Sequence, residues 1–291
     1  MKGILLAGGS GKRLYPLTVS LSKQLLPVYN KPMVYYPLSV LMLAGIRELL
    51  LISTEVHRPQ FQQLLGSGKQ WGIEIKYATQ EQPRGLADAF LLGAEFIDYQ
   101  PCGLILGDNI FYGTGLWDML RQAARIETGA HLFAYPVRDP AEYGVVEFDE
   151  AGKVIGLEEK PRLPRSHFAI TGLYLYDSQV CEIARELSPS KRGELEITDI
   201  NRKYMEMGKL KVELLGRGVA WLDAGTPGDL MQAASFVHTV EERQGLLIGS
   251  PEEVAFRMGF ISKAELNTLI QSMPRGNYRH YLSQLTQRGN R

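Results

Sequence analysis

The segment Gly3-Ile4-Leu5-Leu6-Ala7-Gly8-Gly9-Ser10-Gly11-Lys12-Arg13-Leu14 carries most of the information about the fold. It begins with an apolar run, Gly3 to Ala7, which is typical of a strand buried on both faces of a parallel sheet. The glycine-rich turn that follows directly lets backbone N–H groups approach a phosphate closely. The segment therefore predicts an α/β protein with an anion-binding loop after its first strand.

Short apolar runs and helical patterns alternate through the first half of the chain. Strands are expected at residues 3–7, 48–54, 73–79, 103–107 and 130–137. Helices are expected between them at residues 33–45, 59–65, 86–97 and 116–127. This alternation predicts βαβ units with right-handed crossovers, so the fold class is α/β with a Rossmann-like, mainly parallel sheet.

The pattern changes in the second half. A hairpin is expected over residues 145–149 and 153–158 and a strand at 170–176, which together predict an antiparallel insertion. Helices at 179–187 and 195–207 and strands at 210–215 and 219–222 follow. The remaining sequence contains helix-capping signatures that begin at Thr226, Ser250 and Ser262. We expect one domain overall, with an α/β core over residues 1–225 and a helical C-terminal appendage over 226–291 packed on it.

Composition excludes several classes of protein. The 291 residues are 45% hydrophobic and 22% charged, which suits a globular core, and no apolar run approaches the roughly 20 residues of a membrane span. The first apolar run is too short for a signal peptide. Lys plus Arg and Asp plus Glu both number 32, so no basic excess indicates nucleic acid or a membrane as a partner. Two cysteines without metal-type spacing favour reduced thiols and a cytoplasmic location.

Acidic residues are unevenly distributed. The first 47 residues contain none, although the average share would give about 5, while they contain several Lys and Arg. The stretch from Gly8 to Pro32 also shows no clear periodicity, and it is far longer than the usual βα loop of about 2 to 6 residues. These two properties predict a functional, anion-binding segment.

Two familiar phosphate-binding loops do not fit this segment. A Walker A loop needs Ser or Thr after its lysine, where Arg13 follows Lys12. A dinucleotide-binding loop needs Gly or Ala where Leu14 stands. Arg13 and Lys23 instead suit a polyphosphate, because fixed cations beside a glycine turn neutralise non-bridging oxygens and a departing pyrophosphate.

Two aspartates end apolar runs. Asp108 follows Leu104-Ile105-Leu106-Gly107, and Asp223 follows Ala220-Trp221-Leu222, so each is expected at the carboxyl tip of a strand, where open α/β sheets bind ligands. Mg²⁺ is usually held by one or two carboxylates plus substrate phosphate oxygens. Each aspartate alone also suits a turn or a helix cap, but together with the basic segment the pair predicts a metal–nucleotide site.

The segment Glu158-Glu159-Lys160-Pro161 follows the expected hairpin. A carboxylate beside an ammonium suits a phosphorylated sugar, with Glu159 accepting hydroxyl hydrogen bonds and Lys160 meeting the phosphate. The histidines lack metal-binding spacing and no G-x-S-x-G motif is present, which disfavours zinc and serine hydrolases.

Several longer motifs resemble those of the sugar-phosphate nucleotidylyltransferases, and within them the short-form bacterial glucose-1-phosphate thymidylyltransferases. The first two are Gly8-Gly9-Ser10-Gly11-Lys12-Arg13-Leu14-Tyr15-Pro16-Leu17-Thr18 and Lys23-Gln24-Leu25-Leu26-Pro27-Val28. The others begin at Gly107, Tyr143, Leu157, Arg192 and Trp221. The resemblance covers nearly the whole chain. It implies a GT-A-like nucleotidyltransferase fold whose antiparallel insertion binds the sugar.

The resemblance also implies an activity. Glucose 1-phosphate and dTTP would give dTDP-glucose and pyrophosphate with Mg²⁺ as cofactor, feeding dTDP-rhamnose and surface polysaccharide synthesis. The enzyme would be an allosteric homotetramer. Two alternatives remain open: a uridylyltransferase that uses UTP with glucose 1-phosphate, and a catalytically inactive nucleotide-sugar sensor. The sensor would be expected to lose Arg13, Lys23 or a metal-binding Asp, all of which are present.

Site residues follow from the matching motifs. The catalytic residues would be Arg13, Lys23 and Lys160, and the metal ligands Asp108 and Asp223. Nucleotide binding would involve Gly8, Gly11, Lys12, Arg13, Lys23, Gln24, Gln80, Gly85 and Asp108. Sugar-phosphate binding would involve Asn109, Tyr143, Gly144, Glu159, Lys160, Ile170, Tyr174 and Arg192. A regulatory site would involve Tyr112, Gly113, Gly216, Arg217, Gly218 and Arg257. Lys12 departs from the family, in which Thr is common at that position.

Overall fold

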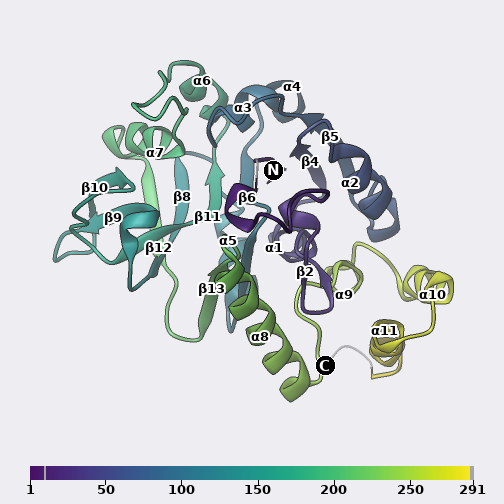
Figure 1. Ribbon diagram of the computed structural model, residues 1–291. Helices are drawn as coiled ribbons and strands as arrows, with labels where there is room; N and C mark the ends of the chain where they lie inside the picture. Colours follow the sequence, from purple (N-terminus) through teal and green to yellow (C-terminus); the bar gives the residue numbers. More distant parts are fainter. Residues whose placement is uncertain (10, 289–291) are drawn as a thin grey trace.

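The computed structural model describes residues 1–9 and 11–288. Ser10 of the glycine-rich motif lies outside the described residues. The fold is built on a central sheet with helices on both faces, and the C-terminal helices lie together at one end of the molecule (Figure 1). No helix in the described part of the chain is both long and apolar enough to cross a membrane.

Parallel strands form one half of the central sheet. In spatial order they are β5 (Glu74–Thr79), β4 (Glu48–Ser53), β1 (Lys2–Ala7) and β6 (Cys102–Leu106). Ile4 pairs with Leu50 on one side and with Leu104 on the other, all three of them buried. The continuous apolar runs therefore arise because both faces of these strands are covered.

The other half of the sheet is mixed. β11 (Phe168–Tyr176) runs antiparallel between β6 and β8 (Ala130–Pro136), and β12 (Leu210–Leu214) pairs in parallel with β8. The hairpin of β9 (Gly144–Phe148) and β10 (Val154–Glu159) joins the first half of β11. The predicted α/β class and the antiparallel insertion are both confirmed.

Two small sheets complete the strands. β7 (Asn109–Gly113) pairs antiparallel with β13 (Val219–Asp223), and β2 (Pro27–Val28) pairs with β3 (Lys31–Pro32). β2 and β3 lie inside the long segment between Gly8 and Pro32, whose described residues otherwise form two short 3₁₀ turns, Lys12–Leu14 and Lys23–Leu25, and irregular loop. The sequence pattern predicted none of β2, β3 and β7.

Helices cover the two faces of the central sheet. One face packs against α1 (Tyr35–Leu43), α2 (Arg58–Leu65) and α5 (Leu116–Ala123). The other packs against α3 (Asp88–Leu92), α4 (Ala94–Ile97), α6 (Val180–Arg185) and α7 (Ile197–Glu206).

The single helix predicted over residues 86–97 is wrong. The chain forms α3 and α4 with a break at Gly93. A Cβ at Gly93 would lie 3.0 Å from both the carbonyl oxygen of Ala89 and Cδ1 of Ile4. The backbone at Gly93 can approach the first strand this closely because glycine has no side chain. The helix is interrupted at this point of contact with the sheet.

The last part of the chain is helical, as the capping signatures predict. It contains α8 (Pro227–Gln244), α9 (Pro251–Arg257), α10 (Lys263–Ser272) and α11 (Asn277–Arg288). Thr226 and Ser262 form complete capping boxes, and the Ser250 side chain accepts from the N–H of Glu253. Apolar residues of α9, α10 and α11 belong to the same buried cluster as α1 and α5, so these helices extend the core of the sheet.

Candidate active site

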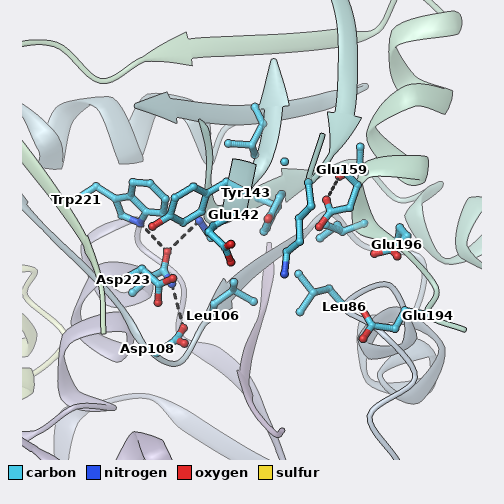
Figure 2. A pocket seen from close by; sticks show the side chains of 18 of the residues that line it. Leu86, Leu106, Asp108, Glu142, Tyr143, Glu159, Glu194, Glu196, Trp221 and Asp223 are labelled. Carbon is cyan, nitrogen blue, oxygen red and sulfur yellow. Dashed lines mark hydrogen bonds between the residues drawn. The ribbon is translucent and has the colours of Figure 1, made fainter. Parts of the chain in front are cut away.

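A cavity of about 670 Å³ opens beyond the carboxyl end of β6, and a smaller one of about 170 Å³ adjoins it over the glycine-rich loop. The two share Leu86, Leu106, Asp108 and Glu194 as lining residues. Figure 2 shows Asp108 and Asp223 on one side of the larger cavity, with Glu159, Glu194 and Glu196 on the other. Together the cavities form one continuous site at the edge where open α/β sheets bind ligands.

Asp108 is held by two neighbours. Lys23 forms an ion pair with its Oδ2, and Asn109 Nδ2 donates to its Oδ1 over 3.0 Å. Both Lys23 and Asp108 are largely shielded from solvent, with side chains 11% and 17% exposed. The cation of the long N-terminal segment therefore reaches the carboxylate at the tip of β6, as the predicted shared site requires.

Asn109, in β7, forms hydrogen bonds to residues of β11 and β13. Its Oδ1 accepts from the backbone N–H of Gly172 over 3.0 Å and from Trp221 Nε1 over 2.6 Å. Because Nδ2 donates to Asp108, this buried amide has little hydrogen-bonding capacity left for a ligand. Asn109 was predicted to contact the sugar phosphate. Although it lines the cavity, its contacts in the structure position Asp108 and the Trp221 ring.

Asp223 is brought beside Asp108 by the β7–β13 pairing, in which Asp223 lies opposite Asn109. The backbone N–H of Ala224 donates to the carbonyl oxygen of Asp108, which closes the junction. Oδ1 of Asp223 is buried and has no hydrogen-bond partner among the described residues. Burial, and next the charge of Asp108, raise the pKa of Asp223 to about 6.

This pair of carboxylates fits a divalent cation. In residues 1–9 and 11–288, no cluster of three or more His, Cys, Asp or Glu side chains could hold a metal ion alone. Mg²⁺ characteristically takes only one or two carboxylates and completes its shell with water and phosphate oxygens. The orphaned oxygen of Asp223 and the repulsion between the two aspartates are what such an ion would relieve.

Arg13 lies on the same side of the site. A Cβ at Gly225 would lie 3.2 Å from Arg13 Nη2 and 3.3 Å from Asp223 Oδ1, so the guanidinium and the carboxylate flank this glycine. Within the described part of the chain, Arg13 forms no ion pair, so the N–H groups of its guanidinium are available to bind an anion. Lys12 is exposed and lines neither cavity.

The glycine-rich loop turns sharply before Arg13. Gly11 has φ +57°, and Thr18 Oγ1 donates to its carbonyl oxygen over 2.9 Å. A Cβ at Gly11 would lie 2.8 Å from Cγ2 of Thr18. The loop thus needs glycine for both its backbone conformation and the packing of Thr18.

The smaller cavity is lined by several of the predicted nucleotide-binding residues: Gly8, Gln24, Gln80, Gly85 and Asp108. Gln24 and Gln80 are both buried, and Gln80 Nε2 donates to Asp88 Oδ2 over 3.0 Å. Gly85 has φ +108°, and a Cβ there would meet the carbonyl oxygen of Leu195 at 2.3 Å. Only glycine permits this approach of the two loops that enclose the cavity.

The far end of the larger cavity carries the predicted sugar-phosphate residues. Glu159 Oε2 accepts from Thr198 Oγ1 over 2.5 Å, and its Oε1 lies 3.7 Å from Arg192 Nη1. Arg192 also pairs with Glu194 and Glu196, so carboxylates already compensate its charge. Lys160, in contrast, has no ion-pair partner among the described residues. It has φ +42°, and its backbone N–H donates to the carbonyl oxygen of Tyr143.

Tyr143, Gly144, Ile170 and Tyr174 also line this end. Tyr143 packs edge-on against Trp221 with ring centroids 5.2 Å apart, and burial raises the pKa of Tyr143 to about 12. Burial likewise raises the pKa of Tyr174. Both phenols therefore remain neutral donors at physiological pH.

Some lining residues were missed from the sequence. Trp221 belongs to an apolar strand, so its pattern indicates core, although its indole fixes Asn109. Thr198 lies in the first turn of α7 and gave no local signal. The remaining missed residues include six acidic or polar ones, Asp139, Glu142, Glu194, Glu196, Thr226 and Asp229, and four others, Leu86, Leu106, Gly172 and Ile197.

The predicted regulatory residues are only partly gathered. Tyr112, Gly113 and Arg257 line a separate cavity of about 210 Å³ between α1, α5 and α9. The turn Gly216 to Gly218 does not line it, although the carbonyl oxygen of Gly218 packs against Gly113 and Arg217 is exposed. Ser39 Oγ, on the wall of this cavity, is buried and unpartnered within the described residues.

The fold and the site together define an enzyme that transfers phosphorus-containing groups. The chain belongs to the nucleotidyl transferase family, which it matches over residues 2–240. It is 56% identical over 288 residues to the glucose-1-phosphate thymidylyltransferase of Xanthomonas campestris pv. campestris (strain B100), covering 99% of this chain and 98% of that one. The glucose-1-phosphate thymidylyltransferase of Mycolicibacterium smegmatis is 54% identical, covering 99% of this chain and 100% of its own.

Solved structures agree with this family. A protein from Bacillus anthracis, assigned as a glucose-1-phosphate thymidylyltransferase and solved with a sucrose, matches with a TM-score of 0.75 at 39% identity. The match covers 81% of this chain and 94% of that one. A UDP-glucose pyrophosphorylase bound to UDP-glucose matches with a TM-score of 0.72 at 22% identity, covering 82% of this chain and 98% of that one, and shares the fold.

Proposed function

We propose that the protein is a glucose-1-phosphate thymidylyltransferase, which makes dTDP-glucose and pyrophosphate from dTTP and glucose 1-phosphate. One observation carries the proposal beyond the family match: Arg13, Lys23, Asp108 and Asp223 converge on one site that continues into both cavities. The smaller cavity suits a nucleoside, and the larger one a sugar phosphate. The point where they join is where the α-phosphate and the sugar phosphate would meet.

The reaction is a direct displacement at phosphorus. A phosphate oxygen of glucose 1-phosphate attacks the α-phosphorus of dTTP, a new P–O bond forms, and the bond to the β-phosphate oxygen breaks. Because the attacking oxygen is already anionic, no general base is needed. The tasks left to the protein are alignment and charge neutralisation.

Each cation has a separate task. Arg13, without an ion-pair partner in the described structure, is placed to neutralise the departing pyrophosphate. Lys160, which forms no ion pair with any residue that the structure describes, lies at the sugar end and would hold the nucleophilic phosphate. Glu159, fixed by Thr198, would accept hydrogen bonds from sugar hydroxyls.

Asp108 and Asp223 would hold Mg²⁺, which when bound supplies positive charge for the phosphate oxygens. Lys23 then has two effects: it orients Asp108 and adds charge beside the triphosphate. Asn109 supports the same carboxylate from the other side.

Pyrophosphate release measured over a panel of nucleoside triphosphates and sugar 1-phosphates tests the proposal. Fastest turnover with dTTP and glucose 1-phosphate, abolished by EDTA, is the expected result. Preference for UTP would make the protein a uridylyltransferase. No turnover with any pair, despite nucleotide binding, would make it a sensor.

We also propose that the cavity beside Tyr112 and Arg257 is regulatory and accepts a dTDP-sugar made downstream. The hydroxyl of Ser39, which has no partner among the described residues, and the guanidinium of Arg257, which pairs with Glu253, offer polar contacts on a mostly apolar wall. Inhibition that glucose 1-phosphate does not relieve, and that Arg257→Ala removes without lowering basal turnover, is the expected outcome.

We further propose a homotetramer working in the cytoplasm. The two cysteines, Cys102 and Cys181, are free and buried, which suits a reducing compartment. Light scattering coupled to gel filtration would measure the assembly directly.

A further inference from the structure

Three polar side chains form a chain of contacts behind the smaller cavity. Arg84 Nη2 lies 2.8 Å from Asp88 Oδ1, and Gln80 Nε2 donates to Asp88 Oδ2 over 3.0 Å. Asp88, the first residue of α3, is only 1% exposed, whereas the Arg84 side chain is 59% exposed. Gln80 is buried at the end of β5 and lines the cavity.

The chemistry of these groups fixes which way Gln80 faces. A carboxylate paired with a guanidinium accepts hydrogen bonds and donates none, so only the amino group of the amide can meet Asp88. The Gln80 carbonyl oxygen must then face the other way. It lies 2.8 Å from the position that a Cβ on Gly8 would take, and Gly8 lines the same cavity.

Turning the amide over is unfavourable in this structure. It would place the Gln80 carbonyl oxygen against the buried carboxylate of Asp88, and would leave that carboxylate short of a donor. Gln24, the other amide that lines this cavity, is held more weakly, since its Nε2 donates to the carbonyl oxygen of Gly8 only over 3.4 Å. Its Oε1 accepts from the hydroxyl of Ser22, and a hydroxyl can act as either donor or acceptor.

We propose that Arg84 and Asp88 are positioning residues that lock Gln80 with its carbonyl oxygen toward the nucleobase, and thereby select pyrimidines with an N3–H over cytosine. Thymine and uracil carry that hydrogen, whereas cytosine has a lone pair at N3, which the carbonyl oxygen repels. The inference rests on the proposed function, which assigns the smaller cavity to the nucleoside. A site with a fixed polar partner rejects an analogue that cannot pair with it far more strongly than an apolar pocket rejects a missing methyl group.

Asp88→Asn tests this selection. The new amide can donate to Gln80 Oε1, which allows the Gln80 amide to turn over. The preference for dTTP over dCTP, as a ratio of kcat/KM values, should fall at least tenfold, the loss of about one hydrogen bond. The preference for dTTP over dUTP and the KM for glucose 1-phosphate should not change, because neither depends on N3.

Glu95→Gln is the matched control, since it removes an exposed carboxylate from the neighbouring helix α4. Its nucleotide preference should equal that of the unmodified protein. Arg84→Met is a second variant that leaves the buried carboxylate in place but removes its cation. The dTTP-over-dCTP preference should fall by a smaller factor, about threefold, with Arg84→Lys retaining most of it.

The inference is overturned if both Asp88→Asn and Arg84→Met fold, by their melting curves, and keep the original dTTP-over-dCTP ratio within twofold. If Asp88→Asn does not fold, Arg84→Met alone decides, because its side chain is mostly in solvent. Absence of dTTP turnover in the unmodified protein refutes the proposed function instead. In that case calorimetric binding of dTDP and dCDP to the same variants decides on the positioning role.

Discussion

Asp223, whose buried Oδ1 has no partner among the described residues, leads to a prediction about stability. Its pKa is raised from 3.8 to about 6, chiefly by burial and next by the charge of Asp108. Between these two values the folded protein holds a proton that the unfolded chain has released. Folding stability therefore falls as pH rises from about 4 to 6, and the full penalty is present above pH 6.

The size of the penalty follows from the difference of about 2 pH units. At about 1.4 kcal/mol per unit, the ionised Asp223 costs the metal-free protein about 3 kcal/mol at pH 8. At pH 4.5 the remaining cost is about 1 kcal/mol, because most of the folded molecules are protonated at this position. Asp223→Asn removes the charge and keeps the shape of the side chain.

We expect Asp223→Asn to be more stable and inactive. In EDTA at pH 8, it should gain between about 1 and 3 kcal/mol, or about 2 to 6 °C in Tm, since the amide itself has some desolvation cost. The gain should shrink at pH 4.5. Mg²⁺ should raise the Tm of the unmodified protein but not of the variant, and pyrophosphate release by the variant should be lost.

Melting curves at the two pH values, with and without Mg²⁺, measure all of this. Glu142→Gln is the control, because Glu142 is an exposed carboxylate of the same cavity, and it should shift Tm by less than about 1 °C. An Asp223→Asn protein no more stable than the original at pH 8 would refute the assigned charge repulsion. A gain equal at both pH values would show that it has another origin.

Three further outcomes are expected. Arg13→Ala should lower kcat by about 100-fold or more without changing Tm, because Arg13 is exposed and forms no ion pair in the described structure; turnover assays beside melting curves check this. Gly85→Ala should raise the KM for dTTP and lower Tm, because the new Cβ would clash with the backbone of Leu195. Gly152→Ala is the control: Gly152 has φ +79° but open space around it, so this change introduces backbone strain alone and should leave the KM for dTTP unchanged. Lys31→Met should destabilise the fold by about 3 to 5 kcal/mol in urea unfolding, because it leaves the buried carboxylate of Glu241, 2.7 Å away, without its cation.

Much of the fold could be predicted because burial and periodicity are local signals. The strand from Gly3 to Ala7 and the helix capped by Thr226 carry their own evidence in a few neighbouring residues. β7 carried none, since only Gly107 and Asp108 separate it from β6 and its partner β13 lies about 110 residues further on. A sequence pattern cannot show a pairing whose stabilising contacts are this distant.

The site was predictable to the same extent. Asp108 and Asp223 were both expected at strand ends, but Asp223 ends β13 of a separate two-stranded sheet, and its proximity to Asp108 depends on the unpredicted β7–β13 pairing. The role of Asn109 could not be read from sequence, because the groups that saturate its amide come from β11 and β13. Residue type predicts which hydrogen bonds a side chain is able to form, whereas the fold determines which partners form them.

The charge of the larger cavity explains why the acid-free N-terminal segment matters. Carboxylates outnumber cations on its lining, and the two groups are Asp108, Asp139, Glu142, Glu159, Glu194, Glu196, Asp223 and Asp229 against Arg13, Lys160 and Arg192. Such a wall would repel two phosphorylated substrates. Arg192 pairs with Glu159, Glu194 and Glu196 but offsets only one of their three charges, and Asp229 is engaged in a capping box.

Under the proposed function, Asp108 and Asp223 are the carboxylates that would face the reacting phosphates. Lys23 offsets one of the two, and Asp223 is left with a buried oxygen that has no partner in the described structure. A divalent cation held by these two aspartates would reverse the sign of the charge that they present to a triphosphate. Binding of dTTP and catalysis should thus share a single metal requirement, with Arg13 and Lys23 of the basic N-terminal segment adding positive charge beside the same two carboxylates.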